Sequence, residues 1–124
     1  FSAIYANSQG PDSESNFWRK PNPNMILRAS KKLNIDLKNS IIVGDRKSDI
    51  MAGLNAGIRL IIHTQTGHGK EERKDVIKLK EEKKSENNFQ IINIDNLCEF
   101  PTELLYKIYK LQRSCPGLTI WFVL

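Results

Sequence analysis

Cysteine is scarce in this sequence. Only Cys98 and Cys115 occur, far apart and outside any CxxC or Cys/His spacing, so neither a disulfide framework nor a zinc site is indicated. No basic segment followed by an apolar core and a cleavage site opens the chain, so no secretory signal is recognised. We therefore expect free thiols in a reducing compartment, the cytoplasm.

Long apolar runs are also absent. The only one of note, Leu118–Leu124, is far too short to cross a bilayer, so no membrane partner is expected. The chain opens on Phe1 and lacks an initiating Met, which favours a fragment of a longer protein.

Charge of a single sign is not concentrated anywhere. The net charge is +5, but in Gly69–Asn87 acidic and basic residues alternate, which is typical of a solvated helix face. Nucleic-acid binding through this segment is therefore a weak hypothesis. A cationic bias also suits a site that receives an anionic substrate. With 124 residues, 40% of them hydrophobic, the chain suffices for one soluble domain.

The order of elements predicts an α/β fold. β-branched runs alternate with helical periodicity, which indicates βαβ units and a mostly parallel sheet in a three-layer sandwich. We assign residues 1–111 to this domain and leave the apolar tail 112–124 open, either as an edge strand or as a segment foreign to the fold. Strands are expected over Phe1–Tyr5, Ser40–Asp45, Ile58–Thr64 and Phe89–Ile94, and helices over 21–35 (Pro23 in the first turn, Asn22 or Asn24 as cap), 46–57 (Gly57 as left-handed stop), 70–84 and 97–111.

The segment IIVGDRKSD, Ile41–Asp49, is the strongest local signal. A buried strand brings Asp45 to its carboxyl end, where ligands bind in open α/β sheets, and Asp49 follows one helical turn later. Carboxylates so placed suit Mg²⁺, which prefers oxygen ligands and meets substrate phosphate. The alternative is that Asp45 is a helix N-cap and Asp49 a solvated helix residue.

A second signal lies in WRKPNPNM, Trp18–Met25. Lys20 precedes Pro21 and must lie in extended chain, since a residue before proline avoids helical angles. A lysine held there can bring one positive charge to a phosphate. The attraction between two unit charges is roughly 4 kcal/mol at about 4 Å and intermediate dielectric. An ordinary exposed loop lysine is the alternative.

The two signals together resemble the haloacid dehalogenase (HAD) superfamily of phosphatases over about residues 3–69. RKPNPNM followed by NIDLKNSIIVGDRKSDIMAGLNAG is most similar to the heptose-bisphosphate phosphatase and histidinol-phosphatase branch. The resemblance implies hydrolysis of a sugar bisphosphate or related phosphoester through an aspartyl-phosphate. It implies that Asp45 binds Mg²⁺, that Lys20 neutralises nucleophile and phosphoryl group, that Arg19 and Arg46 contact substrate, and that Asp49 orients Lys20 or a metal-bound water.

This sequence departs from the family pattern in two ways. No apolar strand ends in Asp-x-Asp, the family's nucleophile and acid/base pair, so this chain alone is expected to be inactive. In the superfamily the nucleophile strand lies beside the strand that matches Ser40–Asp45, so its loss is expected to expose an apolar edge open to another chain. The zinc-loop cysteines and histidine are also missing, so no zinc is expected; the matching positions are Ala6, Ser8, Asn16 and Trp18.

His63 and His68 were considered as ligands or bases. Neither has a partner at metal-binding spacing, so both are interpreted as ordinary structural residues. Two main hypotheses remain: a phosphatase whose N-terminal half lies outside this sequence, and a non-catalytic remnant or binding fragment.

Overall fold

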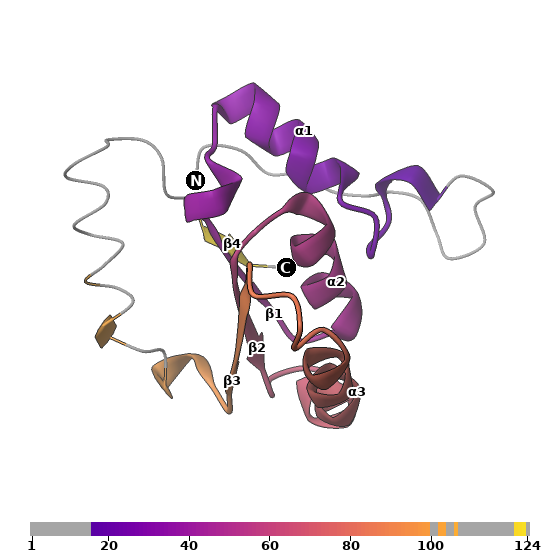
Figure 1. The fold of residues 1–124 in the computed structure, drawn as a ribbon, viewed down its shortest axis with the longest axis vertical. Helices are drawn as coiled ribbons and strands as arrows, with labels where there is room; N and C mark the ends of the chain where they lie inside the picture. Colours follow the sequence, from indigo (N-terminus) through magenta and orange to yellow (C-terminus); the bar gives the residue numbers. More distant parts are fainter. Residues whose placement is uncertain (1–15, 100–101, 104–105, 107–120, 124) are drawn as a thin grey trace.

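A single parallel sheet organises the chain. The structure, a computed structural model, describes residues 16–99, 102–103, 106 and 121–123. Its four strands lie in the order β3-β2-β1-β4 (Figure 1). The elements are η1 (Asn16–Trp18), α1 (Asn24–Leu33), η2 (Leu37–Asn39), β1 (Ile41–Gly44), α2 (Lys47–Ala56), β2 (Leu60–Thr64), α3 (Gly69–Glu82), β3 (Gln90–Ile94), η3 (Leu97–Glu99) and β4 (Trp121–Val123).

Two consecutive crossovers confirm the predicted α/β fold. Helix α2 connects β1 to β2 and helix α3 connects β2 to β3, and both strand pairs are parallel. Gly44 lies opposite His63, which in turn lies opposite Asn93. Because the strands are parallel, the residues that follow β1 and β2 emerge at one edge of the sheet.

Helices α1, α2 and α3 lie together on one side of the sheet (Figure 1). They pack on the inward side chains of three neighbouring strands, and the alternation of side chains along each strand selects which residues these are. Each fully buried isoleucine contributes on the order of 1.5–3 kcal/mol from burial of its side chain. This core contains Ile42, Ile61 and Ile91 from the strands and Ile26, Ile50 and Val76 from the helices.

The opposite face of the sheet is also buried. Ile41, Val43, Ile62 and Ile94 form a second apolar cluster there. The helix expected over Leu97–Leu111 would supply the third layer, but only η3 and the helical positions 102, 103 and 106 belong to the described residues. The third layer therefore stays a prediction, and the strand expected at Phe1–Tyr5 lies outside the described residues.

Three of the predicted helices are present, with ends that differ from the expected ones by one to three residues. Gly57 ends α2 with a left-handed φ of 85°, as expected. At the start of α1, Pro23 is the cap residue and does not lie within the first turn. Neither Asn22 nor Asn24 is the cap residue, so that expectation was wrong; Asn22 instead accepts the Asn24 N–H on its Oδ1 at 3.2 Å, just before the helix.

Strand β4 shows that residues 121–123 of the apolar tail form an edge strand, and the origin of the tail stays open. It pairs with β1 in parallel, with Ile41 opposite Trp121 and Val43 opposite Val123. The tail therefore contributes an edge strand to the sheet. The β1 edge that we expected to be open is occupied over Ile41–Val43, so that expectation was wrong for these residues. The division at residue 112 itself stays a prediction.

Helix α3 carries the mixed charges predicted for it. Lys78 lies 4.0 Å from Glu82, and Lys84 lies 3.8 Å from Glu81. Within the part of the chain that the structure describes, no helix is long and apolar enough to cross a membrane.

Candidate active site

Gly44 and Asp49 come into close contact at the carboxyl end of β1. A Cβ atom placed on Gly44 would lie 2.4 Å from the Asp49 Cβ and 2.7 Å from its Oδ2. Any larger residue at position 44 would therefore push the first turn of α2 away from the strand. Glycine lets this turn pack directly on the strand end.

The Asp49 carboxylate is fully buried and has two partners. Its Oδ1 forms an ion pair with the Lys20 Nζ, and its Oδ2 accepts the Arg46 N–H at 3.0 Å. In return the Asp49 N–H donates to the Arg46 carbonyl at 3.0 Å. Arg46 is thus the cap residue of α2. Both parts of the alternative interpretation are excluded, since Asp45 is not the N-cap and Asp49 is not solvated.

Lys20 reaches the strand end from a distant part of the sequence. Its side chain is 37% exposed, so the amine contacts Asp49 while it remains open to solvent. The Lys20–Pro21 peptide is cis. The Pro21 carbonyl accepts a hydrogen bond from the Asn55 side chain at 3.1 Å, which attaches this loop to α2. Lys20 therefore differs from an ordinary loop lysine.

The loop after β2 surrounds the Asp45 carboxylate. The Asp45 Oδ2 accepts the His68 N–H at 2.8 Å, and the His68 Nδ1 lies 3.7 Å from the same oxygen. Gly67 has a φ of +59°, and a Cβ there would lie 2.2 Å from the Asp45 Oδ2. The loop can approach the carboxylate this closely only with glycine at position 67.

These contacts favour the ionised form of Asp45. Burial by itself would raise the pKa of the Asp45 carboxyl. The hydrogen bonds from the His68 N–H and from the N–H of Asp45 itself, together with the nearby His68 ring and Arg46 guanidinium, outweigh burial and leave the pKa below its ordinary value of 3.8. Asp45 is therefore a carboxylate at neutral pH.

The two arginines lie at the surface of this site. Arg46 is exposed, and its Nη2 lies 2.9 Å from Nε2 and 3.1 Å from Nδ1 of the His68 ring. Arg19 is also exposed and directly precedes Lys20, and its carbonyl accepts the Asn22 N–H at 2.9 Å. The structure therefore brings Lys20, Asp45, Arg46 and Asp49 to one strand end.

Both histidines also lie against Asp45, although the sequence led us to interpret them as ordinary structural residues. His63 is fully buried, and its Nε2 lies 3.1 Å from the Asp45 carbonyl oxygen. Burial lowers the pKa of His63 below its ordinary value of 6.5, despite the opposing effect of this hydrogen bond. Two local signals were present: His68 stands between Gly67 and Gly69, and His63 interrupts an apolar strand.

Asp45 offers one oxygen ligand to a cation. Its Oδ2 is engaged by His68, whereas no other described residue donates a hydrogen bond to its Oδ1. Mg²⁺ takes octahedral oxygen coordination and keeps several waters. Both Asp49 oxygens are engaged, and the described residues contain no group of three potential ligands from His, Cys, Asp or Glu. Asp45 thus fits one position of a magnesium site that these residues do not complete.

Trp18, at one of the positions that the resemblance matches to a zinc loop, has aromatic and cationic neighbours. The Arg28 guanidinium lies 5.2 Å from the centre of its ring, a cation–π contact. Phe17 packs edge-on at 5.1 Å between ring centres. Ala6 and Ser8 lie outside the described residues, so the outcome for the whole loop stays a prediction.

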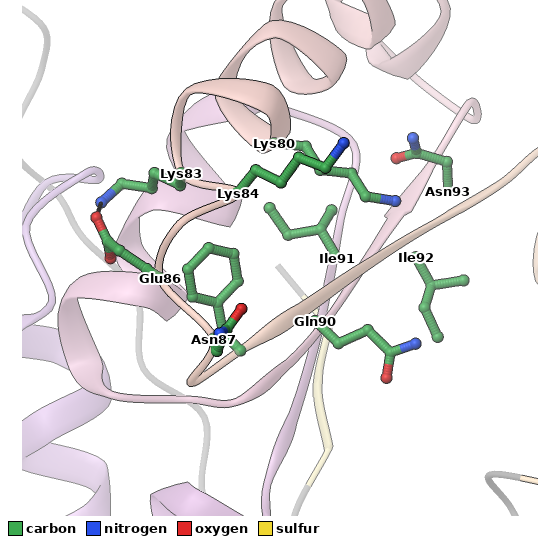
Figure 2. A pocket seen from close by; sticks show the side chains of 10 residues that line it. Lys80, Lys83, Lys84, Glu86, Asn87, Gln90, Ile91, Ile92 and Asn93 are labelled. Carbon is green, nitrogen blue, oxygen red and sulfur yellow. Dashed lines mark hydrogen bonds and ion pairs between the residues drawn. The ribbon is translucent and has the colours of Figure 1, made fainter.

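A separate groove lies between the end of α3 and β3 (Figure 2). Lys80 and Lys84 extend over the strand on the side of Ile91 and Asn93, and Lys83 pairs with Glu86 at 3.0 Å. None of the sequence-predicted site residues lines this groove. The groove is thus separate from the residues at the end of β1 that the sequence singled out.

Comparison with known families gives the class of protein. The model of the HAD-hydrolase-like family matches residues 17–88, which is more than half of the chain and includes Lys20, Asp45 and Asp49. The chain belongs to this family.

The individual relatives narrow the resemblance. The chain is 52% identical over 56 residues to the D-glycero-alpha-D-manno-heptose-1,7-bisphosphate 7-phosphatase of Photorhabdus laumondii, a match that covers 45% of this chain and 31% of the relative. It is 56% identical over 45 residues to the enzyme of the same name from Burkholderia mallei, which covers 36% and 23%. The chain thus matches less than a third of the length of these relatives. No solved structure matches.

Proposed function

We propose that this chain is part of a phosphohydrolase that acts on a sugar bisphosphate of the heptose 1,7-bisphosphate type. The proposal is supported by membership of the HAD-hydrolase-like family and by the names of the similar proteins. The single observation that carries it is the meeting of Lys20, Asp45 and Asp49 at the carboxyl end of β1. These side chains come from two separate parts of the sequence, and ligands bind at such an edge in α/β sheets.

Each residue has a proposed role in this reaction. Asp45, ionised and without a hydrogen bond to its Oδ1 from any other described residue, would hold Mg²⁺. When bound, Mg²⁺ would reduce the repulsion between an attacking carboxylate and the anionic phosphate. Lys20 would add a second positive charge, oriented by the buried Asp49. Arg19 and Arg46 would bind the anionic substrate from the exposed side.

The nucleophile must come from outside these 124 residues. No apolar strand of the sequence ends in Asp-x-Asp, so the covalent step of an aspartyl-phosphate mechanism has no attacking group here. We therefore propose that residues 1–124 alone do not hydrolyse phosphoesters, and that a longer protein supplies the missing strand.

A non-catalytic chain is the second candidate, and one observation favours it. Strand β4 occupies the edge of β1, where the resemblance places the nucleophile strand. A chain that closes this edge with its own residues has no place there for a further strand unless β4 leaves.

A chimera separates the two candidates. Residues 16–99 would replace the matching part of the Photorhabdus laumondii relative, and phosphate release from heptose 1,7-bisphosphate would be measured with Mg²⁺. We expect turnover, and a loss of at least a hundredfold on Asp45→Asn. Asp75→Asn, at an exposed position on α3, is the matched control and should retain full activity.

Two results would contradict these proposals. A folded chimera that binds substrate without turning it over would favour the non-catalytic chain. Turnover by residues 1–124 alone, abolished by Asp45→Asn, would show that the chain needs no further strand.

A further inference from the structure

The peptide group that joins Asp45 to Arg46 is held at both ends by buried side chains. Its carbonyl oxygen lies 3.1 Å from the Nε2 of His63, on β2. Its N–H donates to the Oδ2 of Asp49, on α2, at 3.0 Å. His63 and Asp49 are both completely buried, so one partner of each contact is shielded from water.

The contact fixes which nitrogen of His63 carries the proton. A carbonyl oxygen only accepts hydrogen bonds, so Nε2 must donate and, in the neutral ring, Nδ1 must be unprotonated. Nδ1 is itself buried and has no partner among the described residues. A buried polar atom without a partner is costly, and an apolar side chain at position 63 would avoid that cost. The use of histidine therefore needs a reason beyond filling the core.

The position of His63 suggests that reason. The ladder between β1 and β2 ends with Gly44 opposite His63, so the Asp45 carbonyl is the next main-chain acceptor beyond the last pair. The His63 side chain extends the ladder by one hydrogen bond, at the residue whose carboxylate faces the site. His63 thus holds the carbonyl end of the Asp45–Arg46 peptide, and Asp49 holds its N–H end.

We propose that His63 is a positioning residue: through its Nε2–H it fixes the Asp45–Arg46 peptide, and with it the direction of the Asp45 carboxylate. The functional value of this inference rests on the proposed function, in which Asp45 holds the cation. The contact between His63 and the Asp45 carbonyl does not depend on that function, and it can be tested without any catalytic assay. His63 thereby connects β2 through the Asp45–Arg46 peptide to Asp49 and Lys20.

Two amides of the 124-residue chain report on the placement of Asp45. The Arg46 N–H belongs to the fixed peptide, and the His68 N–H donates to the Asp45 carboxylate. Hydrogen exchange of both would be measured by NMR in the wild type, His63→Gln and His63→Asn. The side-chain amide nitrogen of Gln matches the place of Nε2, whereas that of Asn matches Nδ1 and falls short of the carbonyl.

We expect His63→Asn to speed exchange at Arg46 and His68 at least tenfold, while His63→Gln stays within threefold of the wild type. The amide of Val76, in the core, is the reference for global opening. Equal acceleration at all three amides, or no difference between the two variants, would show that His63 only fills space.

A measurement on the wild type alone guards against variants that do not fold. The ¹⁵N shifts of the His63 ring should show the Nε2–H tautomer at neutral pH. An Nδ1–H tautomer would overturn the proposal, because Nε2 could not then donate to Asp45.

Discussion

Lys20 and Asp49, 29 positions apart in the sequence, form an ion pair in which the carboxylate is fully buried. The pair joins the loop before α1 to the first turn of α2. It also brings a cation to the strand end that carries Asp45. Because the lysine is partly exposed and the aspartate is not, removal of the lysine and removal of the aspartate should change the stability of the fold by different amounts.

Removal of the Lys20 charge should destabilise the fold. In Lys20→Met the buried Asp49 carboxylate keeps only the Arg46 N–H, and an unpaired buried charge costs about 1–3 kcal/mol. Urea denaturation measures the change in the free energy of unfolding. Lys38→Met, at an exposed position, should change it by less than about 0.5 kcal/mol. In Lys20→Met/Asp49→Asn the loss should be smaller than the sum of the single losses, and strict additivity would contradict the pair.

Two left-handed glycines form a matched pair for a second prediction. Gly57→Ala adds a Cβ in open space at φ +85°, so it should cost about 1–2 kcal/mol from the backbone alone. Gly67→Ala has the same backbone strain and also places a Cβ 2.2 Å from the Asp45 Oδ2. It should therefore cost more, and it alone should accelerate exchange of the His68 amide. Calorimetry and hydrogen exchange measure the two effects, and equal costs without a local effect would contradict the loop geometry.

Stability should decrease when the pH falls below about 6.5. Burial lowers the pKa of His63 in the folded chain, whereas in the unfolded chain it keeps its ordinary value of 6.5. Between these two pKa values the unfolded state binds one more proton than the folded state, so the free energy of unfolding rises with pH. The contribution of His63 to stability is fully present above pH 6.5. Asp45 should also make the free energy of unfolding decrease as the pH falls below 3.8, because its pKa in the folded chain is lowered as well.

The control for this prediction is His63→Gln, which cannot titrate. The difference in unfolding free energy between the wild type and this variant should depend on pH from 7.5 to 5, as measured by urea denaturation. A constant difference would show that His63 does not titrate with folding.

Removal of residues 121–124 should expose the edge of β1. The amides of Ile41–Val43 that pair with β4 should then lose protection from hydrogen exchange, whereas the pairing of β2 with β3 should persist. An open edge also favours pairing between chains, so light scattering should detect oligomers. Unchanged exchange at β1 would contradict the parallel pairing.

The fold followed from the sequence where local patterns are strong. The run at Ser40–Asp45 and the run at Ile58–Thr64 became β1 and β2, shortened by one or two residues at their ends. Helix α2 and its stop at Gly57 were predicted from periodicity and from the preference of glycine for left-handed angles. These features depend on contacts close in sequence or on burial of whole segments.

The candidate site was only partly accessible from the sequence. Lys20, Asp45, Arg46 and Asp49 were found through two motifs, and the structure brings them to one edge. The roles of His63 and His68 were missed, because their contacts with Asp45 span 18 and 23 positions and follow from strand register and a loop turn. The path of the tail was equally inaccessible, since three residues of β4 carry no signal for a partner about 80 positions away.

The parallel pairing of β4 with β1 also bears on how the chain is assembled. Ile41 and its partner Trp121 are joined by most of the sequence, so the pair closes a very large loop. During synthesis β1, β2 and β3 emerge from the ribosome well before residue 121. The pairing of β4 with β1 can therefore form only late, after the crossovers that join β1, β2 and β3 are already outside the ribosome.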